Sequence, residues 1–576
     1  MLALAALVAN LLPVAAYSLG QQPRRQQQRS GSAVALADSR KVRALCPSAR
    51  SNGSPSIPAR EAKARGSLFP PATRVAKRGA VLLGQRLTSA QCARALRAQV
   101  VVTGLGTFTS LGHDADTFFN NLLDGKCGID KVTRFDSELS AIKISSEVHD
   151  FDVTKYWEPK DAKRCAALAR RAARSARSCF VMCSSAAPGA CTRSLCSSGG
   201  LRSHGRTPPP PPIPQRVSRT SLYRVRRYDR YAHLAMAAAK TAMADGSLDA
   251  ADVDSNRFGV LIGSGVGGLE SVETSCRILF DKGPKRITPF LLPSIIGNTA
   301  GSMVAIELGA KGPNFGVVSA CATGTHALGE ALKYIQLGDA DVMLAGGTEA
   351  AVTALGFAGF ASMRAMCTNG NDSPQTASRP FDADRSGFVM GEGAGVLLIE
   401  SEEHALARGA KIYCELAGYA ANCDAHHITA PHPEGEGMAN CLHSAMAHAG
   451  VAPTDVQYIN AHGTSTPLND KFETMAYKRV FGDHAPKLKV SSTKGAIGHL
   501  LGAAGGVEAA ICCKVLEKGC IPPTINYQTP DPDCDLDYVP NEKYVSEEPL
   551  NVAISDNLGF GGHNAALVFK RYQPAA

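Results

Sequence analysis

From Val100 onward, the chain alternates between short apolar runs that end near glycines and longer stretches with helical spacing. The apolar runs are rich in β-branched residues, which is typical of buried strands. Such alternation predicts an α/β fold in which helices cover both faces of stacked sheets. The expected strands include Val100–Gly106, Phe258–Ile262, Phe315–Ser319, Val342–Ala345 and Val456–Asn460.

The formal net charge of +10 comes from two segments and not from the alternating part of the chain. Residues 21–98 carry a net +14, and residues 165–227 carry twelve arginines and no acidic residue. Removing both segments leaves −16 for the rest, and no basic stripe with interleaved aromatics is visible there. We therefore expect no nucleic-acid partner.

The first 98 residues have the composition of targeting segments. Residues 1–20 are apolar, are interrupted by Pro13 and are short for a membrane span, so a signal-like segment is expected and no stable membrane anchor in the mature form. Residues 21–98 are rich in Arg, Ser and Ala and poor in acidic residues, as transit peptides are. A signal followed by a transit peptide suits import into a complex plastid. The alternative is an ordinary plastid or mitochondrial presequence.

Residues 165–227 interrupt the alternation with an Arg/Ala run, a Cys/Ser/Gly stretch and five consecutive prolines. This composition cannot bury enough apolar surface to fold, so a disordered insertion is expected. A polyproline recognition site and a metal site at its Cys residues and His204 are weaker alternatives. The flanking sequences read as one loop and helix without it, which suggests translated intron sequence. Tryptic peptides from this segment in the native protein would contradict that origin.

Cys321 is the first candidate for a catalytic residue among the 18 cysteines. It lies in GVVSACATGTHALGEALKYIQLG, where a strand and a tight turn lead into a helix. A helix start provides free N–H groups and partial positive charge, which predicts a stabilised thiolate and an oxyanion site. Most cysteines are simply buried, so the assignment depends on partners.

Two glycine-rich segments supply those partners. NAHGTSTPLND places His462 on a loop after an expected strand, where α/β active sites lie. SSTKGAIGHLLGAAGGVEA places Lys494 and His499 in a turn before a helix that carries Glu508. One cysteine and one histidine would suit a thiol hydrolase or transferase. A second histidine is needed where a second carbonyl must be polarised and a carbanion formed.

Together with SRPFDADRSGFVMGEGAG, DAHHITAP and DNLGFGGHNA, these segments resemble the β-ketoacyl-acyl-carrier-protein synthases, closest to the type II elongating enzymes. The resemblance runs from about residue 100 to residue 571, outside residues 165–227. It implies a thiolase-like α/β fold with two similar βαβ halves in five alternating layers (αβαβα), expected at residues 99–350 and 351–576. It also implies a homodimer and acyl carrier protein as partner.

The family's mechanism assigns roles to the matching residues. Cys321 would hold the acyl chain as a thioester, while His462 and His499 would stabilise the enolate left when malonyl-carrier protein loses CO2. Backbone N–H groups of Cys321 and Phe560 would form the oxyanion hole. No metal or cofactor is expected beyond the phosphopantetheine of the carrier.

The resemblance also assigns supporting roles around this centre. Lys494 and Glu508 would tune protonation, and Thr464 and Thr466 would hold the phosphopantetheine arm. Phe560 would act as a gate in a glycine-rich loop that can move. The glycines of that loop are Gly559, Gly561 and Gly562.

Alternatives remain open at this point. GSGVGG at residues 263–268 satisfies the dinucleotide-binding pattern, although no acidic residue follows at the expected distance. A degradative thiolase would need a second active cysteine, and Cys367, Cys423 and Cys534 lie outside the required setting. The polyketide ketosynthases share the motifs. DNLGFGGHN departs from the family pattern before and after GFGG, which leaves the loop's sterics in question.

Overall fold

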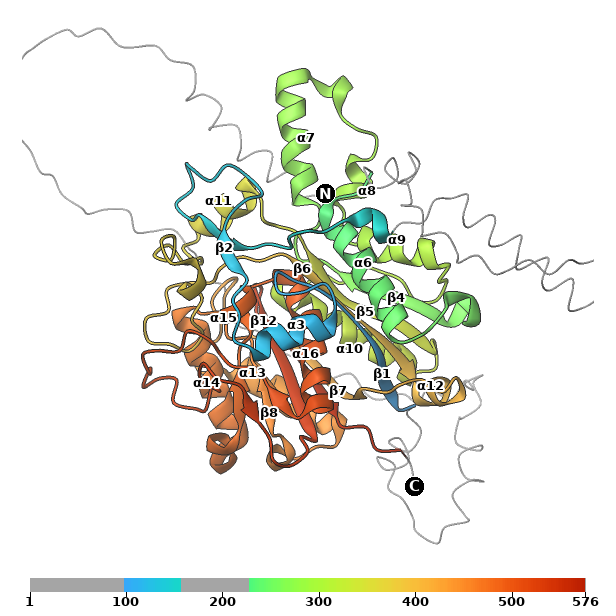
Figure 1. Ribbon diagram of the computed structural model, residues 1–576, viewed down its shortest axis with the longest axis vertical. Helices are drawn as coiled ribbons and strands as arrows, with labels where there is room; N and C mark the ends of the chain where they lie inside the picture. The colour runs from blue at the N-terminus through green and yellow to red at the C-terminus, as the bar shows by residue number, and fades with distance from the viewer. Residues whose placement is uncertain (1–97, 157–226, 575–576) are drawn as a thin grey trace, which may run out of the picture. The chain divides into compact units, whose positions relative to one another are not determined.

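Two groups of strands occupy the centre of the protein, and helices cover both faces of each group (Figure 1). The computed structural model describes residues 98–156 and 227–574. The first group has the order β4-β5-β6-β1 and the second has the order β7-β13-β12-β8-β9. Their bounds are β1 (Val100–Phe108), β4 (Phe258–Gly263), β5 (Val342–Glu349), β6 (Gly393–Ser401), β7 (Cys414–Cys423), β8 (Tyr458–Asn460), β9 (Lys489–Ser491), β12 (Val552–Gly559) and β13 (His563–Lys570).

The two strand groups meet at a short antiparallel contact between β1 and β7, where Val101 pairs with Glu415 and Val102 with Cys414. Four short strands lie outside these groups and form two small sheets within the described residues. They are β2 (Ile129–Lys131), β3 (Ile144–Ser146), β10 (Cys520–Ile521) and β11 (Tyr544–Val545).

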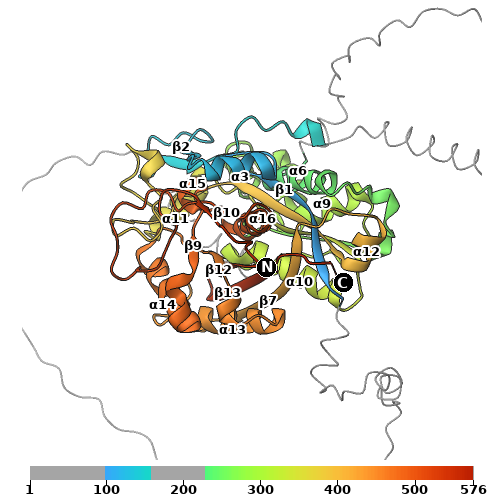
Figure 2. The same ribbon diagram turned by 60° about the horizontal axis from the view of Figure 1, so that its bottom comes forward.

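Helices alternate with the strand groups to make five layers. α10 (Thr323–Gln336) and α16 (Ala504–Lys518) lie between the groups and contact strands of both. α6 (Arg230–Asp245) and α9 (Thr299–Leu308) cover the outer face of the first group. α13 (Glu436–Ala449) covers the second, with α14 (Pro467–Phe481) beside it, on the opposite side of the molecule from α6 and α9 (Figure 2). The predicted αβαβα layering is therefore confirmed.

The remaining helices are shorter or lie at the periphery. They are α3 (Ala115–Leu123), α7 (Leu269–Lys282), α8 (Leu291–Ile295), α11 (Ala354–Ser362), α12 (Glu402–Ala407) and α15 (Lys494–Ile497). No helix among residues 98–156 and 227–574 is long and apolar enough to cross a membrane.

The glycine-rich start of α16 explains how a helix fits between the two strand groups. A Cβ built on Gly506 would lie 2.2 Å from the Gly395 carbonyl oxygen, and one on Gly395 would lie 2.2 Å from the Val507 nitrogen. Helix and strand backbones therefore touch directly, and a methyl group on either side would force them apart. This contact positions the segment that begins α16, on which the functional site depends.

Four of the five expected strands are confirmed as β1, β4, β5 and β8, with shifted ends. The expectation of a strand at Phe315–Ser319 is wrong, because this segment makes no strand pairing and lies outside the sheet. Only Asn314 forms an isolated bridge to β4, and its side-chain Nδ2 donates to the Val260 carbonyl (3.0 Å). The Asn314 side chain thus donates to a carbonyl that would accept from a backbone N–H if the strand pairing continued. Phe315 and Val318 remain 40% and 61% exposed.

Strand pairing also bears on the expected halves. β6 lies after residue 350 in the sequence but pairs with β1 and β5, so the first strand group ends at Ser401. The predicted division of the chain into halves at residue 350 stays a prediction. The expected segments 1–20, 21–98 and 165–227 lie outside the described residues, apart from residues 98 and 227 at their edges.

Candidate active site

Cys321 sits in a strained turn at the start of α10. Ala320, the preceding residue, has a φ of 50°, which is unusual for a side chain with a Cβ. The 3-10 turn Ala320–Ala322 then runs directly into α10, whose apolar face is buried as predicted. This turn directs the Cys321 side chain into a pocket while leaving it only 8% exposed.

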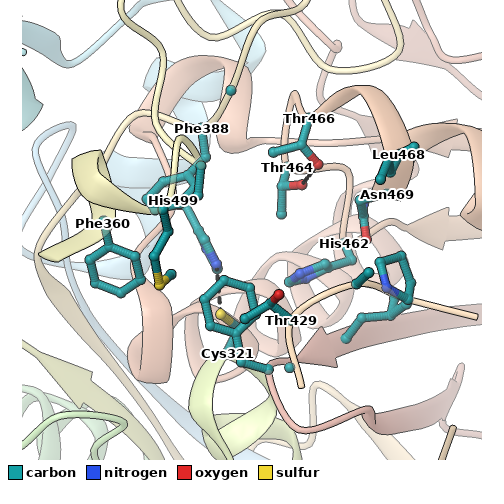
Figure 3. Close-up of a pocket in the computed structure, with 18 of the residues that line it drawn as sticks. Cys321, Phe360, Phe388, Thr429, His462, Thr464, Thr466, Leu468, Asn469 and His499 are labelled. Carbon is teal, nitrogen blue, oxygen red and sulfur yellow. Dashed lines mark hydrogen bonds between the residues drawn. The ribbon is translucent and has the colours of Figure 1, made fainter. Parts of the chain in front are cut away.

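His499 also lines the pocket, and its imidazole ring contacts the Cys321 thiol. Its backbone N–H donates to the Val389 carbonyl (2.7 Å), and its carbonyl accepts from the Gly391 N–H (2.9 Å). Fixed in this way, its Nε2 lies 3.0 Å from Cys321 Sγ (Figure 3). Its Nδ1 is buried without a hydrogen-bond partner among the described residues, so no contact assigns the hydrogen to one ring nitrogen.

His462 approaches the same sulfur from another direction, on the loop that follows β8 (Figure 3). Its backbone N–H donates to Glu473 Oε1 (2.7 Å) and to Asp556 Oδ1 (3.0 Å), which fixes the loop from below. The two imidazole rings are nearly perpendicular, with centroids 5.3 Å apart. The structure thus brings the predicted cysteine and both predicted histidines together.

Lys494 and Glu508 form a buried ion pair behind the histidines, each about 2% exposed. Glu508 Oε2 also accepts a hydrogen bond from Asn557 Nδ2 (2.7 Å), and Thr325 Oγ1 donates to Asn557 Oδ1. These partners fix the orientation of the Asn557 amide. Its second N–H therefore points to His462 Nδ1, which lies 3.2 Å from Nδ2.

This network determines the tautomer of His462. Because Nδ1 accepts from Asn557, the ring hydrogen of the neutral imidazole must be on Nε2. Burial, followed by the charges of Lys494 and His499, lowers the pKa of His462 well below its usual range. Burial and Lys494 do the same to the pKa of His499. Both histidines are therefore neutral near pH 7, and His462 is a hydrogen-bond donor through Nε2.

The thiol behaves differently from the sequence-based expectation. Burial raises the pKa of Cys321 to about 12, although the charge of Lys494 acts in the opposite direction. The prediction of a thiolate at neutral pH is therefore wrong for the resting protein, because loss of solvation outweighs the helix start. Activation must come from proton transfer to a neighbour, and His499 Nε2 is at hydrogen-bond distance.

The pocket above Cys321 has a volume of about 430 Å³ and an apolar lining interrupted by a few polar groups. Thr464 and Thr466 line it and bond to each other through their hydroxyls (2.9 Å). Both threonines therefore occupy the channel where an arm reaching the thiol would lie. Among the described residues, Cys321 is the one cysteine that lines this pocket, so Cys367, Cys423 and Cys534 do not supply a second active thiol there.

The glycine-rich loop closes the pocket beside the nucleophile. A Cβ built on Gly559 would lie 3.4 Å from the Cys321 nitrogen and 2.6 Å from the Ser319 carbonyl oxygen. Phe560 therefore follows directly after a backbone contact with the Cys321 turn, as a shared oxyanion site requires. Gly561 and Gly562 have φ values of 95° and 74°, which favour glycine.

Sequence reasoning missed Asn557, Thr325, Glu473 and Asp556. The last two accept from the N–H groups of the His462 loop, and the Tyr477 hydroxyl lies within hydrogen-bond distance of both and donates its one hydrogen to either of them. Asn557 lies within the quoted motif DNLGFGGHN, but the departures from the family pattern fall at its neighbours Leu558 and His563, so they did not single it out. Among the described residues, no cluster of three or more His, Cys, Asp or Glu side chains could hold a metal ion.

A buried cysteine paired with one neutral imidazole and faced by a second, in a five-layer αβαβα fold, defines a thiolase-like condensing enzyme. The comparisons agree with this class. Residues 211–405 match the model of the β-ketoacyl synthase N-terminal domain, and residues 413–528 match that of the C-terminal domain. The chain belongs to the β-ketoacyl synthase family and is an acyltransferase-type condensing enzyme. The break between the two matches falls between β6 and β7, in agreement with the strand pairing.

Curated relatives and solved structures match most of the chain. The 3-oxoacyl-[acyl-carrier-protein] synthase 2 of Staphylococcus aureus strain N315 is 44% identical over 475 residues, covering 82% of this chain and 99% of the relative. The protein of that name from Synechocystis is 43% identical over 477 residues, covering 83% and 99%.

Two solved structures share the fold. A type II polyketide ketosynthase in complex with its acyl-carrier protein (AntDE:AntF) has a TM-score of 0.67 and 31% identity, covering 83% of this chain and all of that chain. A β-ketoacyl synthase from Burkholderia phymatum has a TM-score of 0.65 and 29% identity, with the same coverage. The predicted thiolase-like fold and family are thereby confirmed.

Proposed function

We propose that this protein is a 3-oxoacyl-[acyl-carrier-protein] synthase that extends fatty acyl chains by decarboxylative condensation with malonyl-acyl carrier protein. One observation carries the proposal: Cys321 Sγ lies 3.0 Å from His499 Nε2 in a pocket that also contains His462. A hydrolase needs only the first pair. The second neutral imidazole, held as a donor by Asn557, suits a step in which negative charge develops on a second carbonyl oxygen.

In the first half-reaction, the Cys321 thiol gives its proton to His499 Nε2 as sulfur attacks the acyl thioester carbonyl. Backbone N–H groups of Cys321 and Phe560 bind the oxyanion. Collapse of the tetrahedral intermediate breaks the bond to the carrier thiol, which leaves with the proton from His499. The acyl group is then a thioester on Cys321, and the protein has regained its resting charges.

In the second half-reaction, the thioester carbonyl of malonyl-carrier protein accepts a hydrogen bond from His462 Nε2–H. His499 is a second donor to the same oxygen when its hydrogen is on Nε2. The carbon–carboxylate bond breaks, CO2 leaves and the electron pair forms an enolate. The enolate carbon attacks the acyl-Cys321 carbonyl, the bond to sulfur breaks, and the Cys321 thiolate takes up one proton from solvent, which balances the negative charge of the lost malonyl carboxylate. The low pKa values of both imidazoles keep them from protonating the enolate carbon.

The carrier partner and the pathway belong to this proposal. The relatives with 43–44% identity are named as synthases acting on acyl-carrier protein, whereas the polyketide ketosynthase is 31% identical. Fatty acid elongation is therefore the favoured pathway and polyketide synthesis the alternative. Exposed Arg364 lines the pocket mouth, where it would face the phosphate of a phosphopantetheine arm. That arm would be the reaction's carried group, and no metal or other cofactor takes part in the proposed steps.

Intact-mass measurement tests the proposal. The wild-type protein is incubated with acyl carrier proteins carrying saturated chains of graded length, and separately with β-ketoacyl chains. The expected result is one acyl adduct from saturated donors and none on the Cys321→Ala variant. Adducts from polyketide-type donors alone would favour the alternative pathway, and no adduct from any donor would overturn the assignment.

A homodimer is also proposed. Ile306 on α9 is 74% exposed, and the segment after Asn314 exposes Phe315 and Val318 beside the edge strand β4. Exposed apolar side chains beside a sheet edge suit contact with a symmetry copy of the chain. Light scattering should give a dimer for the wild type and a monomer for Val318→Asp, whereas a wild-type monomer would contradict it.

We propose plastid import directed by residues 1–98, with the mitochondrion as the alternative. The support is the composition of the two segments described above. Residues 1–98 fused to a fluorescent protein should enter plastids in a plastid-bearing cell. Residues 21–98 alone should fail where the plastid has extra membranes, and entry into mitochondria would decide for the alternative.

A further inference from the structure

The glycine-rich turn at residues 263–268 has an occupant within the chain. It follows β4 and has the spacing that dinucleotide-binding proteins use to hold a pyrophosphate with backbone N–H groups. Here those groups bind the carboxyl of Glu349, at the end of β5. Gly265 N–H donates to Oε2 (2.8 Å), Val266 N–H to Oε1 (3.3 Å) and the Ser264 hydroxyl to Oε1 (2.7 Å).

The same carboxyl reaches the two sides of the catalytic pair. Glu349 Oε2 also accepts from the N–H of Gly502, three residues after His499 (3.1 Å). Gly265 lies against the nucleophile turn, since a Cβ built on it would be 3.3 Å from the Ala320 carbonyl oxygen. One fully buried carboxyl oxygen thus links the turn behind Cys321 to the turn after His499.

We propose that this turn is an internal anion site whose ligand is the Glu349 carboxyl, and that Glu349 is a positioning residue that holds Cys321 and His499 at reacting distance. The proposal rests on Cys321 being the acyl-accepting nucleophile. It accounts for the dinucleotide-like motif, because the N–H groups that a pyrophosphate would need are already used. It also explains how the strained conformation of Ala320 is supported, because the packed neighbour Gly265 is itself anchored.

The charge of Glu349 gives this role a measurable signature. Burial raises the pKa of its carboxyl to about 7, against the lowering effect of the Ser264, Gly265, Gly502 and Val266 donors. The ionised form raises the pKa of Cys321. Burial raises the pKa of Tyr231 on α6, and the charges of Asp229 and Glu349 add to this effect; the Tyr231 hydroxyl donates to the Ile296 carbonyl (2.7 Å). The charge of Lys494 lowers the pKa of Cys321, and the charge of Glu508 raises it.

Alkylation of Cys321 by iodoacetamide should report this charge. Thiolate concentration rises about tenfold per pH unit below the thiol pKa. As Glu349 ionises near pH 7, repulsion of the thiolate should flatten that rise in the wild type. In Glu349→Gln the logarithm of the rate should rise with unit slope through pH 7. The variant should also acylate Cys321 about tenfold more slowly, because one pair of N–H donors loses its acceptor at a cost near 1.4 kcal/mol.

Glu147→Gln is the matched control. Glu147 is also buried and also accepts from a backbone N–H and a hydroxyl, Thr133 N (2.9 Å) and Ser145 Oγ (2.9 Å), but it does not line the catalytic pocket. We expect its alkylation profile and acylation rate to match the wild type. The proposal is overturned if Glu349→Gln behaves as Glu147→Gln does, or if its acylation falls only in proportion to the folded fraction measured by circular dichroism.

A second variant covers loss of folding in Glu349→Gln. Ser264→Ala removes one donor and keeps the carboxyl, so acylation should fall by a smaller factor in a folded protein, and wild-type rates there would overturn the proposal. Alkylation needs no acyl donor. A wild type that forms no acyl adduct would therefore contradict the proposed function, whereas the alkylation profiles would still test Glu349.

Discussion

Replacing Asn557 with leucine should separate the two half-reactions. The amide donates to Glu508 Oε2 (2.7 Å) and to His462 Nδ1 (3.2 Å), and leucine has a similar volume without either donor. His462 Nδ1 would then have no partner that keeps the hydrogen on Nε2. The donor that stabilises the enolate would be lost from part of the population, while the contact between Cys321 and His499 would remain.

The magnitude follows from the bonds removed. A neutral hydrogen bond contributes about 1 to 1.5 kcal/mol, so the equilibrium ratio of the Nε2–H to the Nδ1–H tautomer of His462 should fall about tenfold. CO2 release from malonyl-carrier protein on the acylated protein should therefore fall, by up to about tenfold. Acylation of Cys321 should change by less than about twofold, because its proton acceptor is untouched. Two buried acceptors left without a donor should lower the unfolding free energy by about 2 to 6 kcal/mol.

The assay uses two steps on the same preparation. Intact-mass spectrometry follows acylation, and trapped CO2 follows decarboxylation after malonyl-carrier protein is added. Asn121→Leu is the matched control, since its Nδ2 donates to the Leu111 carbonyl (2.7 Å) outside the pocket lining. Equal losses in both steps, or no loss in decarboxylation by a folded Asn557→Leu protein, would refute the tautomer argument.

Three further perturbations test other parts of the site. Lys494→Met should lower the unfolding free energy, measured in urea, by about 3 to 5 kcal/mol, because Glu508 would be buried without its cation. The double variant Lys494→Met with Glu508→Leu should recover most of that stability. Equal stability of the wild type and both variants would contradict the expected cost of an unpaired buried charge. Because burial raises the pKa of Cys321 to about 12, the rate at which wild-type Cys321 is alkylated should still be increasing at pH 10. A rate that reaches a plateau at neutral pH would show that the resting thiol is already ionised. Gly561→Ala should slow acylation by long chains, since φ is 95° and the new Cβ would lie 3.0 Å from His563 Nε2; unchanged rates for all chain lengths would exclude a moving loop there.

The sequence predicted the parts of the fold that local patterns determine. The apolar run Val342–Ala345 is a strand whose residues are all buried, because helices cover both faces of the sheet there. In α10 the buried apolar residues are those that helical spacing predicts. The segment at Phe315–Ser319 is also a short apolar run but lies outside the sheet, because the Asn314 side chain donates to the β4 carbonyl with which the next backbone N–H would pair. A single side-chain hydrogen bond of this kind leaves no trace in hydrophobic periodicity.

The site was predictable in its residues and not in its electrostatics. Cys321, His462 and His499 stand out because their glycine-rich surroundings are distinctive. The protonation of Cys321 depends on burial by segments hundreds of residues apart, and this reversed the expected thiolate. Asn557 and Glu349 were not identified because their roles exist only where β12, α16 and the turn after β4 meet. Motif spacing along the chain contains no information about such contacts.

The central claim is that Cys321 carries the acyl group while His462 generates the attacking carbanion. The most direct test loads wild type and His462→Asn with an acyl chain from acyl carrier protein, then adds malonyl-carrier protein and follows the adduct by intact mass. We predict that both proteins form the adduct on Cys321, and that only the wild type discharges it rapidly with release of CO2. Rapid discharge by His462→Asn, or an adduct on a residue other than Cys321, would contradict the account.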